Sequence, residues 1–501
     1  MSIKTYDTII IGAGWSGSVA AKQLTAKGHS VLVLEARDRI GGRARTYVNG
    51  NDKVDLGCSW IHGYKEGNPA RGIAKELGVD AHLPKSFEGV IYGPEGPLSS
   101  EQAASLRSSL SSAQAAFKLP HPAPPSSASL ASALFADSSP LFKSSATPSS
   151  DAANTNVSST SPANPSEGAP SSKAGYDKAL AEGLARTLEV PLGLKLEKAS
   201  LKWAGWESTT SFAGSDAAPD GGYQDLVKKV LDSSRAEVKL SQKVTGIKQS
   251  EDGATIKVVT SQGEFEGKTI ISTIPLGVLK TLPEGFFQPA LPPKFTETIA
   301  GTHVGILEKL LLQYDEAWWP NASTTGSYTF LPIGPTPTEN SSIEEIFNGS
   351  SLITANFNAP SLPNPSPTLL TYLSETPAKL LLVKPKEEVL KGFHQFLVKR
   401  LGVKANGGEN RVVSEPKAGE LTDWLKDEYS YGATTTPSIV SQGDERSPMD
   451  FKELGRPVWN GKLGFAGEHT EMEHRGSVAG AVVSGLREAE RVNRLLNLLK
   501  E

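Results

Sequence analysis

Three glycines and a glutamate near the start of the chain have the spacing of a phosphate-binding loop. Gly12, Gly14 and Gly17 form the pattern Gly-x-Gly-x-x-Gly, and Glu35 lies 18 positions after Gly17. In this pattern the first glycine permits a tight turn, the second lets the backbone approach a pyrophosphate, and the third lets a helix pack closely. The N-terminus of that helix then faces the phosphates, and Glu35 is placed to accept hydrogen bonds from a ribose.

This chemistry requires a strand before the loop and a helix after it. Residues 8–11 are a short apolar run, which is typical of a strand buried on both faces. Residues 18–26 carry apolar side chains at helical spacing, and Gly28 stands where such a helix should stop. Residues 30–34 predict a second strand, so the segment reads as one βαβ unit. Between a strand and a helix, the glycine pattern is a specific signal of a dinucleotide-binding loop.

Both ends of the chain carry residues suited to a long cofactor. After Glu35, residues 37–45 add Gly41, Gly42 and four arginines, at positions 37, 39, 43 and 45. Near the other end, a predicted strand at 463–466 is followed by Glu468 and by a long helix, whose apolar residues repeat at threes and fours between 478 and 496. A cofactor held by both ends is long, and FAD fits better than NAD.

Between these ends we expect further β-structure and two proline-rich loops. The predicted strands are 238–240, 255–259, 269–274 and 308–314, a helix is expected to end at Leu188, and the loops are 289–293 and 335–367. Residues 119–175 consist largely of Ser, Pro, Ala, Thr and Asn, a composition that buries too little apolar surface to fold. We predict a disordered insertion there, with a short element near 130–142.

Composition excludes several classes of protein. At about 150 residues per domain, 501 residues indicate two to four domains. The 51 basic and 55 acidic residues nearly balance, which argues against a nucleic-acid partner. A single cysteine, Cys58, favours a reducing compartment, and no leader or membrane-length apolar run is present, so we expect a cytoplasmic protein. The eight histidines are scattered, so no metal site is expected.

Several of these segments, taken together, resemble a known family. They are 12–17, 35–45, 55–63, 221–223, 273–280, 308–309 and 464–488. The chain resembles the flavin-dependent amine oxidases, and among them the polyamine oxidases. The resemblance implies an α/β fold, in which a Rossmann-like FAD-binding domain of the glutathione-reductase-like kind is interleaved with a mixed α+β substrate domain. The FAD-binding domain would comprise 1–80, 212–285 and 415–501, and the substrate domain 81–211 and 286–414.

The resemblance also implies which residues hold FAD. Glu35 and Arg43 would hold the adenosine and pyrophosphate, Val244 would face the adenine, and Glu468 the ribityl or pyrophosphate part. Ser477 and Val478 would lie beside the isoalloxazine. The full set of expected cofactor-binding residues is Gly12, Gly14, Gly17, Glu35, Arg37, Gly42, Arg43, Trp60, Val244, Trp424, Glu468, Ser477 and Val478. Monoamine oxidases attach FAD through a cysteine just before the last helix; this chain has only Cys58, so non-covalent FAD is expected.

Three residues are candidates for catalysis by the same resemblance. Lys309 stands where the family keeps a lysine that is bound through a water to flavin N5. His62 matches a histidine in the substrate channel of polyamine oxidases. His474 occupies the position where those enzymes usually have a tyrosine facing the flavin, and a histidine orients an amine less well and can itself titrate.

The expected activity is oxidation of a small-molecule amine, with hydride passing to flavin, hydrolysis of the imine, and reoxidation by O2 to H2O2. A polyamine such as spermine or an acetylated polyamine is the expected substrate, and a monomer or weak homodimer is the expected assembly. Two alternatives stay open. One is an FAD-dependent oxidase of an L-amino acid, for which Arg475 could bind the carboxylate, or of a carbocycle. The other is a flavoprotein that acts as a ligand-binding or interaction protein.

Overall fold

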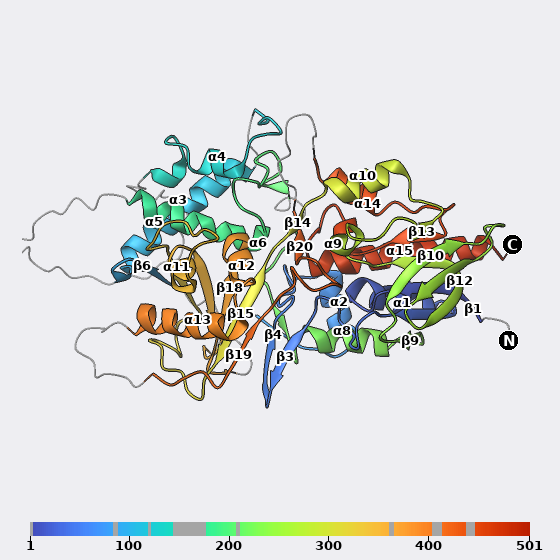
Figure 1. Ribbon diagram of the computed structural model, residues 1–501, viewed down its shortest axis with the longest axis horizontal. Coiled ribbons are helices and arrows are strands. Elements are labelled where there is room, and N and C mark those ends of the chain that lie inside the picture. The colour runs from blue at the N-terminus through green and yellow to red at the C-terminus, as the bar shows by residue number, and fades with distance from the viewer. Residues whose placement is uncertain are drawn as a thin grey trace, which may run out of the picture.

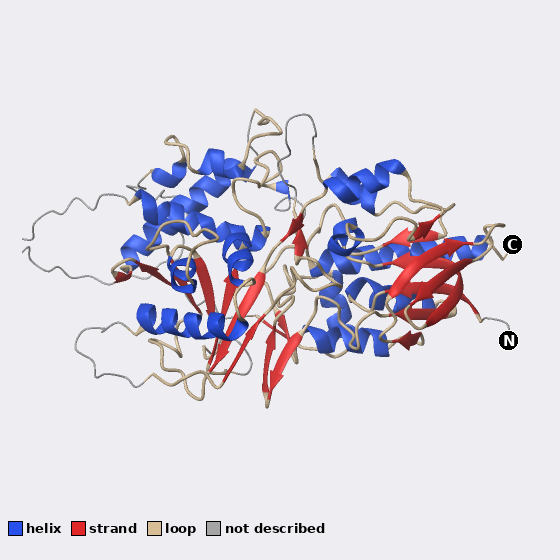
Figure 2. Cartoon of the chain, in the orientation of Figure 1, coloured by secondary structure: helices blue, strands red, loops and turns tan. Residues whose placement is uncertain are grey.

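The computed structural model describes residues 4–83, 89–118, 122–143, 177–206, 211–359, 365–402, 413–436 and 446–500. These residues form two lobes that lie side by side, with both termini at the far end of one lobe (Figure 1). Each lobe is built on one large sheet, and Figure 2 shows the strands of the two sheets as separate groups. Among the helices described, none combines the length and apolar character needed to cross a membrane.

The sheet of the lobe that carries the termini has parallel strands at its centre. Its order is β13-β10-β11-β12-β1-β2-β9, with β21 also paired to β12. The strands are β1 (Thr5–Ile11), β2 (Val31–Leu34), β9 (Glu237–Lys239), β10 (Val244–Gln249), β11 (Ile256–Thr260), β12 (Gly263–Ser272), β13 (Phe287–Gln288) and β21 (Leu463–Phe465). The βαβ unit predicted at the start of the chain is present, because β1 pairs with β2 in parallel and a helix joins them.

Helices cover both faces of this sheet, which explains why β1 is apolar throughout. Ile10 packs on one face with α1 (Trp15–Ala26) and α15 (Val478–Leu498). Ile9 and Ile11 pack on the other face with α9 (Leu276–Leu279), α10 (Pro293–Gly301) and α14 (Met449–Leu454). Strands buried on both faces read as continuous apolar runs.

The predicted C-terminal helix is α15, and it lies against α1. A side chain at Gly485 would come within 2.5 Å of the Ser16 carbonyl oxygen, so this glycine permits the close approach of the two helices. Helix α1 begins at Trp15, earlier than the predicted start at residue 18, and therefore contains Gly17. Two further helices flank this part, namely α2 (Pro69–Glu76) and α8 (Tyr223–Asp232).

The second lobe has a largely antiparallel sheet, in the order β19-β15-β18-β17-β16-β6-β7. Its strands are β6 (Val90–Gly93), β7 (Gly96–Pro97), β15 (Glu308–Gln313), β16 (Ser327–Phe330), β17 (Leu352–Asn356), β18 (Thr368–Leu373) and β19 (Ala418–Leu421). Its helices α11 (Ile343–Asn348), α12 (Glu375–Leu381) and α13 (Lys386–Leu401) enclose an aromatic-rich core. The remaining described strands form small two-stranded sheets: β3 (Thr46–Asn49) with β4 (Asp52–Asp55), β5 (Ala81–His82) with β8 (Ala218–Pro219), and β14 (Val304–Gly305) with β20 (Thr434–Thr435).

The prediction of a loop over 335–367 was wrong. This stretch contains α11 and β17. Ser342 and Glu345 form a capping box that starts α11, and Ile346 and Phe347 bury their side chains in the core of the lobe. The prolines on either side concealed a short amphipathic helix.

The Ser/Pro-rich stretch contains two short helices within its described part, where one short element was expected. They are α4 (Leu130–Leu134) and the 3₁₀-helix η1 (Pro140–Phe142). They pack with α3 (Ser100–Lys118), α5 (Lys178–Ala185) and the turns η2 (Arg186–Leu188) and α6 (Glu189–Leu192). Leu130, Leu134 and Leu141 are buried in this cluster, so residues 122–143 are ordered by tertiary packing. The prediction of disorder for 119–121 and 144–175 falls outside the described residues.

The sheets do not change at the domain boundaries expected from the sequence. Strand β13 lies after residue 285, yet it pairs with β10 in the first sheet. Strand β19 lies after residue 415, yet it pairs with β15 in the second sheet. Helix α10 also packs on the first lobe, through Phe295 and Ile299. By sheet pairing, the boundaries expected at 285/286 and at 414/415 therefore both lie at higher residue numbers.

Candidate functional site

A cavity of about 560 Å³ lies where the loops of the two lobes meet. Its wall begins at the carboxyl ends of β1, β2 and β12, the edge at which parallel sheets bind ligands. It continues along residues 56–62 and reaches β15 and β18 of the second lobe. Of the expected site residues, the wall includes Gly12, Gly14, Glu35, Arg37, Gly42, Arg43, Trp60, His62, Val244, Lys309, Trp424, Glu468, Ser477 and Val478.

The glycine loop forms one end of the cavity. Gly12 has a φ of +106°, and a Cβ there would lie 2.3 Å from Thr273 Oγ1. Gly14 and Gly42 face each other across two turns, since a Cβ on Gly42 would lie 3.4 Å from the Gly14 Cα. Gly17 stands behind the wall, where a Cβ would lie 2.0 Å from the Gly12 carbonyl oxygen. Its role in the structure is helix packing, as the spacing predicts for the third glycine.

Glu35 is held by the backbone around the loop. Its carboxylate accepts hydrogen bonds from the amides of Ala13, at 2.7 Å, and Arg37, at 2.8 Å. Burial raises the pKa of Glu35, although these two hydrogen bonds act to lower it. A glutamate at the end of β2 and beside the start of α1 is suited to a ribose hydroxyl.

A loop over 427–430, here named the strap, covers the same end of the cavity. Asp427 accepts two hydrogen bonds from the Arg37 guanidinium, at 2.7 and 2.8 Å. Glu428 pairs with Lys243 at 2.6 Å. Tyr429 lies against both cations, 5.2 Å from Arg37 and 5.7 Å from Lys243. Tyr429 therefore belongs to the wall near Glu35 and not to the end near Lys309.

Glu468 is buried at the middle of the wall, and its carboxylate is fully engaged. It accepts hydrogen bonds from Arg43 at 2.9 Å, Thr435 at 2.7 Å and the amide of Gly476 at 2.9 Å. Burial opposes its ionisation, but Arg43 and the hydrogen bonds outweigh burial and lower the pKa of Glu468. The carboxylate thus orients Arg43 toward the cavity.

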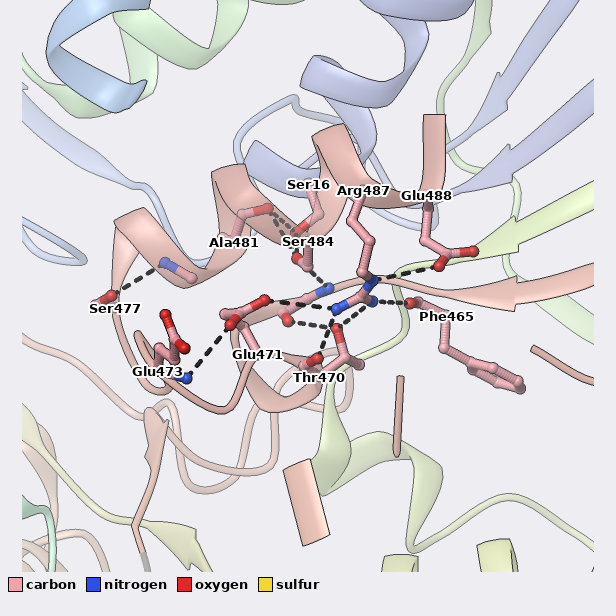
Figure 3. A network of polar contacts seen from close by, with 12 residues as sticks. Ser16, Phe465, Thr470, Glu471, Glu473, Ser477, Ala481, Ser484, Arg487 and Glu488 are labelled. Atoms are coloured by element: carbon pink, nitrogen blue, oxygen red, sulfur yellow. Dashed lines mark hydrogen bonds and ion pairs between the residues drawn. The ribbon is translucent and has the colours of Figure 1, made fainter. Parts of the chain in front are cut away.

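The turn from Phe465 to Thr470 contains Glu468. Side chains of α15 hold this turn in place (Figure 3). Arg487 donates hydrogen bonds to the carbonyl oxygens of Phe465 and Thr470, both at 2.7 Å. Ser484, one turn earlier on α15, accepts a hydrogen bond from the Gly467 amide at 2.9 Å. The turn contains the 3₁₀-helix η3 (Glu468–Thr470). Ser477 caps α15 by accepting a hydrogen bond from the Gly480 amide. The first residues of this helix line the cavity.

Lys309 lies at the opposite end of the cavity, on β15. Its ammonium donates hydrogen bonds to the carbonyl oxygens of Asp55, at 2.8 Å, and Gly57, at 2.6 Å, and to Ser59 Oγ at 2.6 Å. Tyr372, its cross-strand partner on β18, places its ring 5.5 Å from the ammonium. Only 5% of the residue is exposed. Burial lowers the pKa of Lys309 to about 8, although the charge of Asp55 opposes the decrease.

His62 lies at the exposed end of the wall, with 62% of its side chain accessible. Its Nδ1 is 2.8 Å from the Asp216 carboxylate, which also accepts a hydrogen bond from the Gly63 amide. The hydrogen bond with His62 lowers the pKa of Asp216. The sequence did not single out Asp216, because it is 154 residues away from its partner.

Aromatic side chains line the same cavity as His62 and Lys309. Trp60 donates a hydrogen bond to Tyr372, and both rings line the cavity. Trp424 lies in the wall as well, and its indole donates to the Leu56 carbonyl oxygen at 3.3 Å. Tyr372 was missed by the sequence reading, because only its pairing opposite Lys309 shows its place.

The structure does not bring His474 or Arg475 into the wall. His474 stacks on Phe212, with ring centroids 4.4 Å apart. The buried Arg475 guanidinium donates to Thr435 O and to Thr436 Oγ1. Its position outside the wall weakens the amino-acid alternative, which relied on this arginine.

The wall fits a dinucleotide such as FAD. The opposed glycines Gly14 and Gly42 let a ligand approach the backbone closely. The start of α1 has no side-chain cap, so its backbone amides are available to phosphates. Arg37 and Arg43 are held in place by Asp427 and Glu468. The thiol of Cys58 lines the cavity, and burial raises its pKa, which disfavours the reactive thiolate. Over the described ranges, no group of His, Cys, Asp and Glu side chains could hold a metal ion.

The chain matches a known protein family along most of its length. The family model described as flavin containing amine oxidoreductase matches residues 16–493. The chain is 24% identical over 489 residues to probable polyamine oxidase 4 of Arabidopsis thaliana, covering 97% of this chain and 87% of that protein. It is 26% identical over 526 residues to flavin-containing amine oxidase B of Sus scrofa, covering 99% and 87%. It is also 28% identical over 542 residues to lysine-specific histone demethylase 1 homolog 3 of Arabidopsis thaliana, covering 97% of this chain and 30% of that protein.

Proposed function

Because the chain belongs to the flavin containing amine oxidoreductases and has FAD as its cofactor, we propose that it is a polyamine oxidase. The proposed substrate is spermine or an acetylated polyamine, oxidised at a carbon next to a secondary nitrogen. Similarity along nearly the whole length of plant polyamine oxidases supports this substrate class. The proposed assembly is a monomer or weak homodimer.

When bound, FAD would supply a two-electron acceptor for the hydride on the carbon next to the nitrogen, and O2 would take up the two electrons and become H2O2. The resulting imine reacts with water to give an aldehyde and a shorter amine. The chain itself binds and orients the amine, excludes water, and provides charge near the reacting atoms. An amine loses hydride only after it loses its proton, so kcat/KM is expected to rise with pH toward the pKa of the amine.

The observation that carries the proposal is the pair of His62 and Asp216: His62 lines the cavity that contains Lys309, and Asp216 contacts His62 from outside the cavity lining. A polyamine carries several cationic nitrogens along an apolar chain. The carboxylate of Asp216 is ionised and 46% exposed, and it can attract a distal ammonium. Trp60 and Tyr372, farther inside, provide apolar and π surfaces for the methylene chain.

The charge on the wall supports a cationic substrate over an amino acid. A carboxylate would need an available arginine, and the two arginines of the described wall are paired with Asp427 and Glu468. Lys309 directs its three donors to Asp55, Gly57 and Ser59. Carbocycle oxidation and a purely ligand-binding role have no specific observation in their favour.

The test is a visible spectrum of the purified, FAD-loaded protein under anaerobic conditions, before and after spermine, N-acetylspermine or a simple primary amine is added. We expect the polyamines to bleach the flavin bands within seconds to minutes and admitted air to restore them. A His62→Ala variant should show lower kcat/KM for the polyamines, whereas the exposed Lys399→Met variant should behave like the wild type. If spermine and its acetylated form leave the flavin oxidised while another amine reduces it, the polyamine proposal is wrong.

A further inference from the structure

Glu308 is a fully buried carboxylate immediately before Lys309. Both chain neighbours of Glu308 line the cavity, namely Leu307 just before β15 and Lys309 within it, whereas Glu308 does not. Successive side chains of a strand point to opposite faces, so Glu308 projects behind the wall. Its exposed fraction is 0%. The proposed reaction assigns this residue no role.

The Glu308 carboxylate collects three hydrogen bonds from one segment. Thr422 Oγ1 and the Trp424 amide, the latter at 3.0 Å, donate to one oxygen, and the Leu425 amide donates to the other at 2.8 Å. A buried carboxyl with this many donors is a strong anchor, because charge-assisted hydrogen bonds are stronger than neutral ones. Burial raises the pKa of Glu308 to about 7 in spite of these three donors, and the nearby charge of Asp423 acts in the same direction.

Thr422 extends the anchor to the lysine. Its hydroxyl oxygen accepts a hydrogen bond from the Lys309 amide at 2.8 Å, while its own amide donates to the Lys309 carbonyl oxygen at 2.9 Å. One hydroxyl therefore links the backbone of Lys309 to the carboxylate of Glu308.

Trp424 is held from two sides by the same arrangement. Glu308 binds its amide, and the Leu56 carbonyl oxygen binds its indole. Leu56 lies between Asp55 and Gly57, whose carbonyl oxygens receive the Lys309 ammonium. The backbone of Lys309, its ammonium and the ring of Trp424 thus belong to one connected network with Glu308 at its base.

We propose that Glu308 is a positioning residue, which fixes Lys309 and Trp424 together in the wall that faces FAD. The inference relies on the proposed placement of the cofactor in this cavity, and not on a polyamine as the substrate. No step of the reaction passes through Glu308.

The test compares Glu308→Gln and Glu308→Leu with matched variants of Glu375. Glu375 is also buried, at 1% exposure, and it lies on the same lobe, where it pairs with Lys198 and Lys379. It is not among the residues that line the cavity, and its hydrogen-bond donors are the Lys195 amide and the ammonium groups of Lys198 and Lys379. Glu375→Gln and Glu375→Leu therefore measure the cost of losing a buried carboxylate without moving the wall.

The readouts are the dissociation constant of FAD, from reconstitution of the apoprotein followed by flavin fluorescence, and the visible circular dichroism of the bound flavin. For Glu308→Leu we expect FAD binding about tenfold weaker, as for the loss of one charge-assisted hydrogen bond, and an altered dichroism spectrum. Glu308→Gln keeps one acceptor oxygen and should recover part of both signals. The Glu375 variants should lower the melting temperature and change neither signal.

A second variant keeps the inference testable if Glu308→Leu does not fold. Thr422→Val removes only the hydroxyl between Glu308 and Lys309, and it should perturb flavin dichroism in the same direction. The inference is wrong if the folded Glu308 variants bind FAD with wild-type affinity and dichroism, or if the Glu375 variants change both signals equally. These readouts use no amine, so a failure of the polyamine proposal leaves the result unaffected.

Discussion

Replacing Lys309 with methionine removes an ammonium from the cavity and retains nearly the same side-chain length. The ammonium has three acceptors, Asp55 O, Gly57 O and Ser59 Oγ. We expect the rate of flavin reduction or of flavin reoxidation to fall by about 10²- to 10⁴-fold, which is the usual contribution of a lost proton-transfer group. A cation at this place can stabilise the electron density that arrives on the flavin.

The stability of the same variant follows from two opposing terms. Burial lowers the pKa of Lys309 from 10.5 to about 8, which at 1.36 kcal/mol per pKa unit is a cost of about 3 kcal/mol for the charged form at neutral pH. Methionine avoids this cost but leaves the carbonyl oxygens of Asp55 and Gly57 without their donor, at about 1–3 kcal/mol each. The free energy of unfolding should therefore stay within about 3 kcal/mol of the wild-type value.

The pH dependence gives an independent check. Between about 8 and 10.5 the folded protein has released the proton of Lys309, whereas the unfolded chain still binds it. The unfolded state binds more protons over this window, so this lysine makes the free energy of unfolding rise with pH there. The methionine variant should lack that rise.

The assay is stopped-flow spectroscopy on the FAD-loaded variant. Anaerobic mixing with the amine measures flavin reduction, and mixing of the reduced protein with oxygenated buffer measures reoxidation. Flavin content and melting temperature are measured first, so that loss of cofactor is separated from loss of rate. Lys399→Met, which changes a lysine 64% exposed, serves as the control. Wild-type rate constants for both half-reactions in a folded, FAD-loaded Lys309→Met protein would refute the reasoning.

Three further predictions concern how the cofactor is held. Lys243→Met removes the ion pair between Lys243 and Glu428 of the strap, so FAD should dissociate several-fold faster and the dissociation rate should depend less on salt. An unchanged dissociation rate in a fluorescence chase would exclude a role for the strap. Arg487→Met removes the donors that hold the turn of Glu468, and titration of the apoprotein should show about tenfold weaker FAD binding; the exposed Arg494→Met is the control. Denaturation should release all flavin into the supernatant, and colour retained by the precipitate would contradict a non-covalent cofactor.

Local sequence was sufficient for the elements at the two ends of the chain. The glycine spacing, the apolar run of β1 and the repeat of α15 each depend on neighbours a few residues apart, and a strand or helix expresses such patterns directly. The positions of Gly12, Gly14 and Glu35 in the wall follow from the same βαβ unit. Local patterns failed where a short element was enclosed by prolines, as α11 is.

Tertiary structure decided the partners of the candidate residues. Lys309 contacts the backbone of Asp55 and Gly57, which lie more than 250 residues earlier in the chain, and His62 contacts Asp216, which lies 154 residues later. His474 was matched by linear position, but the fold turns its ring onto Phe212.

The lobe boundaries were decided in the same way, because β13 and β19 join sheets according to hydrogen-bond pairing and not according to their order along the chain. The sequence by itself determined the family, the cofactor and the presence of the βαβ unit at the start of the chain. Only the tertiary structure determined which charges face each other in the cavity, because contacts between distant segments arise from packing and leave no periodic signal in the chain.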